Sequence, residues 1–199
     1  MDTALEAKLK ELIAKDEIRD ALMRYARGVD RGDPDLITSA FHPDAVDDHG
    51  GTTLVGTEAG PRFTGTRKLS ASGAVGQHFM GNITIELEGD TAYTESYFVS
   101  YLIVDRDGAE YTRFRGARYI DRFERRHGAW KIAYRVVVDD WDRMDKVTEH
   151  APMREMWRRG DIRERDPFAQ LRRGPIADNE RKLREDMKDR FQTKEGAAR

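Results

Sequence analysis

Apolar positions at helical spacing mark the beginning of the chain. They lie mostly three or four residues apart: Leu5, Leu9, Leu12, Ile13, Ile18, Leu22, Tyr25 and Val29. This spacing predicts a helix over residues 4–29. Asp16 is a suitable N-cap for a second segment, so we expect a break at residues 15–16. A short helix is predicted over residues 34–41, because Asp33 caps it and Pro34 suits its first position.

The middle of the chain changes from helical to strand periodicity. Residues 42–76 are rich in Gly, Asp, Thr and Ser, which predicts short strands, loops and a short helix near 68–74. From Gln77 the apolar period is two, and strands are predicted over residues 77–87, 91–104, 110–125 and 130–141. Tight turns join them, so the four strands form an antiparallel meander. Helices followed by a strongly curved sheet give an α+β fold.

Charged residues dominate the chain after Arg143. Residues 144–199 contain few large apolar side chains, although Leu183, Met187 and Phe191 have the spacing of a charged helix over residues 178–191. We therefore expect a barrel domain over residues 1–145 and an extension over residues 146–199. The basic and acidic residues around Trp157 balance, which favours a solvated arm over a nucleic-acid patch.

Composition narrows the class of protein. The 35 basic and 37 acidic residues give a net charge of −2, which provides no reason to invoke nucleic acid or an anionic membrane as a partner. With no cysteine, the chain has no disulfides and no thiolate chemistry. The N-terminal residues lack the features of a signal peptide, and no apolar run approaches the ~20 residues that span a bilayer. We expect a soluble, cytoplasmic protein.

Two residues far apart in the sequence are candidates for acid–base chemistry. Asp30 follows the first helix, where the helix dipole disfavours a carboxylate. His78 opens the first long strand, and strict alternation places it on the face of Met80, Asn82 and Thr84. Taken singly, Asp30 is more simply explained as a surface aspartate, and His78 as a histidine hydrogen-bonded to the backbone.

Three separated motifs resemble the SnoaL-like proteins, which share a superfamily with nuclear transport factor 2 and scytalone dehydratase. The motifs are IRDALMRYARGVD at 18–30 with FHPDA at 41–45, HFMGNITI at 78–85 and FERRHGAWKI at 123–132. The resemblance covers residues 10–145. It implies a cone-shaped α+β barrel, built from a mixed, mostly antiparallel sheet that wraps around the N-terminal helices.

Around the site, the sequence is most similar to hexachlorocyclohexane dehydrochlorinase and bile-acid 7α-dehydratase. Both carry an aspartate and a histidine at the positions of Asp30 and His78. The bile-acid enzyme also has a tyrosine that Tyr25 matches. The resemblance therefore implies that His78, Asp30 and Tyr25 are catalytic. Asp139 stands where the bile-acid enzyme has an arginine, so the substrate is not carried over.

These residue types suit an enzyme that needs no cofactor. A neutral imidazole takes a proton from carbon, a carboxylate orients and stabilises it, and a phenol donates a hydrogen bond. We expect a lyase that eliminates water, hydrogen halide or formaldehyde from a small hydrophobic cyclic or aromatic substrate. The alternatives are a non-catalytic scaffold, such as an oxygenase small subunit, and an isomerase of the ketosteroid type, which more naturally uses a carboxylate base.

Four further residues are candidates for contacts with the substrate. His49 is expected at the pocket mouth, Tyr97 and Tyr101 share one strand face, and Asn82 shares the face predicted for His78. The group around Asp47 and His49 resembles a metal cluster only superficially, and we predict no metal site.

The outer face of the predicted sheet indicates self-association. It carries apolar residues such as Val136 and Val138, and large exposed apolar patches usually mark interfaces. We therefore expect a homo-oligomer, with a trimer favoured over a dimer, and a C-terminal extension that packs on its own barrel or on a neighbour.

Overall fold

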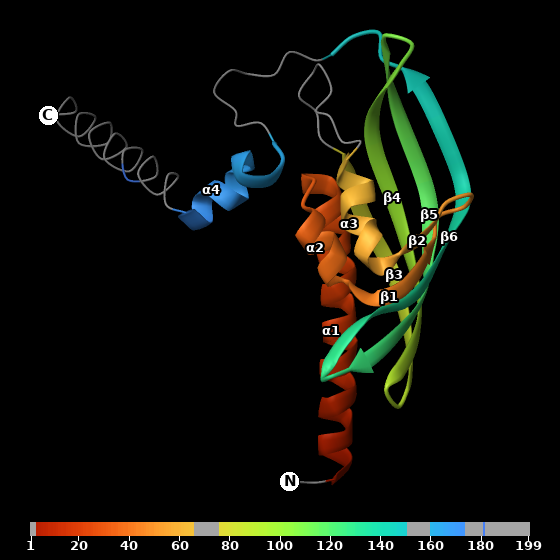
Figure 1. Cartoon of the computed structure of the whole chain (residues 1–199), viewed down its shortest axis with the longest axis vertical. Helices are drawn as coiled ribbons and strands as arrows, with labels where there is room; N and C mark the ends of the chain where they lie inside the picture. Colours follow the sequence, from red (N-terminus) through yellow and green to blue (C-terminus); the bar gives the residue numbers. More distant parts are fainter. Residues whose placement is uncertain (1–2, 66–75, 151–159, 174–180, 182–199) are drawn as a thin grey trace, which may run out of the picture.

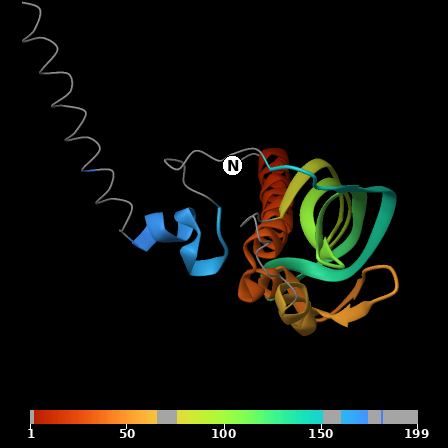
Figure 2. The ribbon, with the colours of Figure 1, turned by 90° about the horizontal axis from the view of Figure 1, so that it is seen from above.

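A computed structural model describes residues 3–65, 76–150, 160–173 and 181 of the chain. Helices cover one side of a curved sheet, and the sheet wraps around the long first helix (Figures 1 and 2). The expected helices at 68–74 and, apart from position 181, at 178–191 lie outside the described residues. So do Trp157 and the end of the chain. None of the described helices is long and apolar enough to cross a membrane.

The first helix, α1, is continuous from Thr3 to Arg31, so the predicted break at Asp16 is wrong. Asp16 lies on the exposed side of the helix and does not act as a cap. Ion pairs at i,i+4 spacing, such as Lys15–Glu11 at 2.5 Å, support the exposed face near this position. The second half of α1 buries Ile18, Leu22 and Tyr25 against the sheet.

Three short elements connect α1 to the meander. The helix α2 (Pro34–Ser39) begins as predicted, because an Asp33 carboxylate oxygen accepts a hydrogen bond from the Leu36 amide at 3.0 Å. The strands β1 (Phe41–Asp48) and β2 (Thr53–Val55) form a hairpin, and α3 (Gly56–Gly65) follows. The FHPDA motif therefore opens a strand.

The four predicted strands are present and longer than expected. They are β3 (Gln77–Glu88), β4 (Thr91–Arg106), β5 (Ala109–Arg126) and β6 (Ala129–Lys146). The sheet order is β2-β1-β6-β5-β4-β3, and only the pairing of β1 with β6 is parallel. Within the described residues the edge strands β2 and β3 do not pair with each other, so the barrel stays open on one side (Figure 2).

A β-bulge interrupts β3. Met80 pairs with Phe98 and Ile83 pairs with Ser96, so three steps along β3 match two along β4. The extra residue reverses the alternation, which puts His78 and Met80 on the same concave face as Ile83 and Ile85. The predicted alternation was therefore correct on either side of the bulge and wrong across it.

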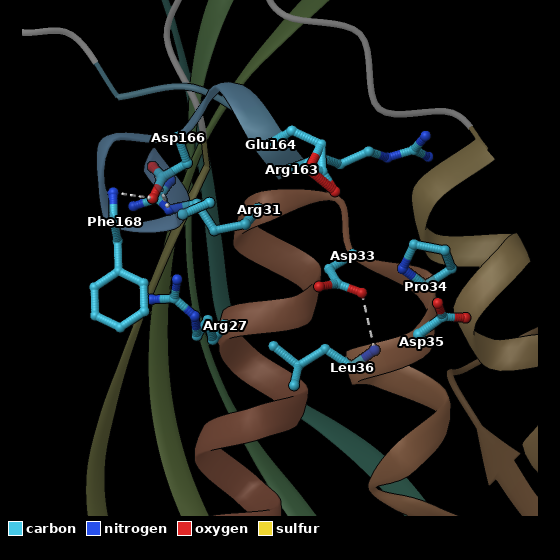
Figure 3. A pocket seen from close by; sticks show the side chains of 11 residues that line it. Arg27, Arg31, Asp33, Pro34, Asp35, Leu36, Arg163, Glu164, Asp166 and Phe168 are labelled. Carbon is cyan, nitrogen blue, oxygen red and sulfur yellow. Dashed lines mark hydrogen bonds and ion pairs between the residues drawn. The ribbon is translucent and has the colours of Figure 1, made fainter. Parts of the chain in front are cut away.

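The extension contributes a short segment that packs on the end of α1. It contains the 3₁₀ turn η1 (Arg163–Arg165) and the helix α4 (Pro167–Arg173). Arg163 Nε donates to the Gly32 carbonyl at 2.9 Å, and the Arg27 guanidinium lies 4.2 Å from the centre of the Phe168 ring. A cavity of about 700 Å³ separates this segment from α1 and α2 (Figure 3). Its lining is mostly charged and includes neither Asp30 nor His78.

Candidate active site

The last turn of α1 and the first residues of β3 meet through a double hydrogen bond. Asp30 Oδ1 lies 2.7 Å from His78 Nδ1, and the other oxygen of Asp30 accepts a hydrogen bond from the His78 amide at 2.9 Å. The side chain of His78 is 8% exposed and that of Asp30 is 13% exposed. The contact expected from the sequence is thus present, and one carboxylate holds both the ring and the backbone of its partner.

The carboxylate of Asp30 sets the tautomer of His78. An ionised carboxylate only accepts hydrogen bonds, so in the neutral imidazole the proton must be on Nδ1. Nε2 then carries the lone pair and faces away from Asp30. A neutral imidazole held in this way is suited to accept a proton, and the adjacent carboxylate stabilises the imidazolium that forms.

Aromatic rings surround the dyad on the concave side. The His78 ring lies 5.6 Å from Phe98, which stacks on Tyr119 at 4.2 Å. Tyr119 in turn contacts Tyr25 edge-on at 5.5 Å. These rings come from β3, β4, β5 and α1, so aromatic side chains from four elements border the dyad on the concave side.

Tyr25 lies deeper in the barrel and is almost fully buried. Burial raises the pKa of its hydroxyl well above the ordinary value, although the nearby Arg135 opposes this effect. The phenol therefore stays protonated and remains a hydrogen-bond donor.

A buried ion pair that the sequence reasoning missed lies beside Tyr25. Arg135 of β6 binds both carboxylate oxygens of Asp121 of β5, at 2.7 and 2.8 Å, and both side chains are 0% exposed. The Arg135 guanidinium lies 4.3 Å from the Tyr25 ring centre and 4.0 Å from that of Tyr119. Burial raises the pKa of Asp121 despite the attraction of Arg135. The sequence signal for this ion pair was the presence of one charged residue, Asp121 on β5 and Arg135 on β6, in the row of each strand that otherwise faces inward.

A second arginine lies beside Phe98, the ring next to His78. Arg115 of β5 is 5.7 Å from the centre of the Phe98 ring and forms an ion pair with Asp139 of β6. The concave face therefore carries a cation from β5, next to Asp139. Other arginines of this strand, Arg113, Arg118 and Arg122, are also ion-paired.

Three predicted substrate contacts do not share the concave face with His78, contrary to the prediction. Tyr97 alternates with the buried Ser96 and Phe98, and it is 42% exposed on the convex face. Tyr101 lies in the same outward row, where it contacts Phe114. Asn82 is exposed because the bulge turns it away from the side of His78.

His49 comes directly after β1 and is partly buried. Its Nδ1 lies 2.8 Å from Asp47 Oδ1, and its ring is 4.6 Å from Phe63 of α3. Asp47 is fully buried whereas Asp48 caps the adjacent turn by accepting from the Gly50 amide. Among the described residues, no three His, Asp or Glu side chains are grouped as metal ligands.

Comparisons with known proteins agree with the fold. Residues 10–136 match the model of the SnoaL-like domain. A hexachlorocyclohexane dehydrochlorinase (LinA type 2) is 19% identical, with 73% of this chain and 97% of that chain covered and a TM-score of 0.61. A scytalone dehydratase-like protein from Novosphingobium aromaticivorans is 16% identical, with 71% and 91% covered and a TM-score of 0.56.

A third solved structure is more similar in sequence. It is an NTF2-like protein with a cystatin-like fold, from Novosphingobium aromaticivorans, which is 27% identical over 69% of this chain and 88% of that chain, with a TM-score of 0.56. No curated protein sequence matches the chain. Because the sequence identities are low, the similarity to the dehydrochlorinase and to the dehydratase-like protein shows the fold alone.

Proposed function

The chain belongs to the family of SnoaL-like domain proteins, and on that premise we propose that it is a cofactor-independent lyase with His78 as its general base. The observation that carries the proposal is the double hydrogen bond from Asp30 to the ring and the amide of His78. A buried carboxylate that only terminated the helix would have no need of an imidazole. Here it fixes the tautomer that leaves Nε2 able to accept a proton.

The reaction requires a substrate whose leaving group is β to an acidic C–H. His78 Nε2 takes the proton from carbon, the C–H electron pair forms the double bond, and the leaving group departs with its own electron pair. Asp30 stabilises the resulting imidazolium. Tyr25 stays protonated and offers a hydrogen bond to an oxygen that gains negative charge.

The substrate class follows from the side chains beside His78. Phe98 and Tyr119 form a stacked apolar wall, and Arg115 adds a cation at its edge. This combination favours a small cyclic or aromatic molecule that carries a carbonyl or carboxylate group. In this elimination the leaving group is water or a halide. Loss of formaldehyde would instead begin with His78 Nε2 taking the O–H proton of a hydroxymethyl group, so that the C=O bond of formaldehyde forms and the C–C electron pair stays on the ring carbon.

The test is a substrate screen with a matched inactive variant. The purified chain and His78→Gln are incubated with hydroxylated, halogenated and hydroxymethylated cyclic compounds, and mass spectrometry detects the loss of water, hydrogen halide or formaldehyde. Product from the wild-type chain but not from His78→Gln supports the lyase. Equal product from both chains would place the base elsewhere. Binding of a compound without turnover would instead favour the non-catalytic binding role.

A further inference from the structure

A second imidazole–carboxylate pair lies in the barrel, formed by Asp47 and His49. Asp47 is 0% exposed, and its Oδ1 lies 2.8 Å from His49 Nδ1. The His49 side chain is 16% exposed and packs against Phe63. As in the first dyad, the carboxylate binds Nδ1, so Nε2 is the nitrogen directed away from Asp47. No partner for this Nε2 is found among the residues the structure describes.

The two dyads share the concave side of the sheet. Asp47 points inward from β1, and His49, two residues later, continues in the same direction. His78 points inward from β3, at the opposite edge of the same curved sheet. Phe63, the ring beside His49, also contacts Tyr25 at 6.3 Å. The aromatic cluster that borders His78 therefore extends to His49.

Burial distinguishes this pair from a surface contact. A carboxylate without solvent must be compensated by charge or hydrogen bonds. Asp47 also interacts electrostatically with the buried Arg135, but the two hydrogen bonds that Arg135 donates to a carboxylate go to Asp121. The second oxygen of Asp47 has no hydrogen-bond partner among the described residues. His49 is therefore the hydrogen-bonded partner of Asp47, and with Nδ1 held by the carboxylate, Nε2 is the nitrogen free to exchange a proton with a substrate.

We propose that His49 is the general acid of the reaction, acting on the leaving group while His78 acts on the C–H bond. This inference rests on the proposed function. His78 Nε2 takes the carbon-bound proton, the C–H electron pair forms the double bond, and the C–O bond breaks with its pair on oxygen. That oxygen takes the proton of His49 Nε2–H and departs as a neutral alcohol or water. Proton exchange with solvent then restores both imidazoles.

The sharpest test compares two probes that differ only in how much the leaving group needs a proton. 3-Phenoxycyclohexanone releases phenoxide, a poor leaving group, whereas 3-(4-nitrophenoxy)cyclohexanone releases nitrophenoxide, which leaves without protonation. The quantity measured is the ratio of kcat/KM for the phenoxy probe to kcat/KM for the nitrophenoxy probe. His49→Gln should lower this ratio by about 100-fold, because general-acid catalysis contributes about that factor.

Two control variants separate the possible outcomes. His78→Gln should lower both rates together and leave the ratio unchanged, because both probes lose the same proton from carbon. His127→Gln, in the β5–β6 turn, should change neither rate. In His49→Ala, added imidazole should restore the phenoxy rate in preference to the nitrophenoxy rate.

The inference is overturned if His49→Gln leaves the ratio at the wild-type value while His78→Gln abolishes both rates. In that case the proposed lyase survives and His49 has no acid role. If His78→Gln has no effect, or the wild-type chain eliminates neither probe, the proposed function fails first, and this inference fails with it.

Discussion

Asp30 binds His78 at two points, with one oxygen on the ring nitrogen and the other on the backbone amide. The first contact sets which nitrogen is basic, and the second fixes where β3 begins relative to α1. The dyad is therefore part of the junction between the longest helix and the edge of the sheet. A substitution at either residue has to be judged by activity and stability together.

Replacement of His78 by Gln should lower turnover by at least ~10²-fold, because the general base is lost. Asp30→Asn should be nearly as harmful, since an amide nitrogen turned toward Nδ1 would favour the wrong tautomer. The measurements are kcat/KM on a substrate from the screen and thermal unfolding by circular dichroism. A large loss of activity in Asp30→Asn that is matched by general unfolding would show a structural role only.

Tyr25 should not titrate while the protein is folded. Because burial raises the pKa of Tyr25 well above the ordinary value, its hydroxyl keeps its proton as the pH rises. The near-ultraviolet absorbance of tyrosinate should therefore rise equally in the wild-type chain and in Tyr25→Phe until alkaline unfolding begins. Tyr97→Phe, at an exposed position, is the matched control for the loss of one tyrosine hydroxyl. A smaller rise in Tyr25→Phe would contradict the assignment.

Removing only one partner of the ion pair between Arg135 and Asp121 should strongly destabilise the folded chain. Asp121→Asn leaves a fully buried guanidinium without its hydrogen-bonded carboxylate, which should destabilise the fold by about 3–5 kcal/mol. The double variant Arg135→Met with Asp121→Leu should lose less than the single change. Urea unfolding followed by tryptophan fluorescence measures both. A loss below about 1 kcal/mol in Asp121→Asn would mean that the barrel admits water at this point.

Gly28 permits the close contact between α1 and α2. A Cβ atom at this position would lie 2.7 Å from Ile37 Cγ1 and 2.8 Å from the Ile37 backbone nitrogen. Gly28→Ala should therefore push α2 away and cost about 1–3 kcal/mol, despite the better helix propensity of alanine. Met23→Ala, on the exposed side of the same helix, should change the free energy of unfolding little. Equal stability of the Gly28→Ala and wild-type chains would refute the contact.

Self-association remains a prediction, with a trimer favoured. On the convex face, Ile120 and Val136 lie side by side and Tyr134 is 39% exposed. The first turns of α1 also expose Leu5 and Leu12, at 50% and 62%. Light scattering should return a multiple of 22.9 kDa, and Val136→Asp should lower the mass. A wild-type mass of 22.9 kDa at micromolar concentration would exclude the oligomer.

Local patterns were sufficient for most of the fold. Period-two alternation and turn residues located the four long strands within a few residues, and the Asp33–Pro34 pair located α2. The break predicted at Asp16 failed because a cap signal inside a helix of good formers does not outweigh continued backbone hydrogen bonding.

The site was less accessible from the sequence. The roles of Asp30 and His78 were predicted from family resemblance, because nothing in their spacing along the chain shows that the two side chains are in contact. The pairing of Arg135 with Asp121 depends on the register between β5 and β6, which alternation alone does not fix. The tyrosine row of β4 was assigned correctly to a single face, but alternation does not say which of the two faces is concave.

Because of the bulge in β3, the face on which His78 lies depends on whether the number of residues between it and Ile83 is odd or even. Counted along a regular strand, His78 and Ile83 are five positions apart and would point in opposite directions. One inserted residue makes the count even, so that an aliphatic core and a reactive imidazole face the same interior. Deletion of Gly81 would remove no functional group and would still send His78 outward or the core residues into solvent. For this segment, insertions and deletions are thus a greater hazard than substitutions, and related chains that lack the extra residue are not expected to use a histidine here.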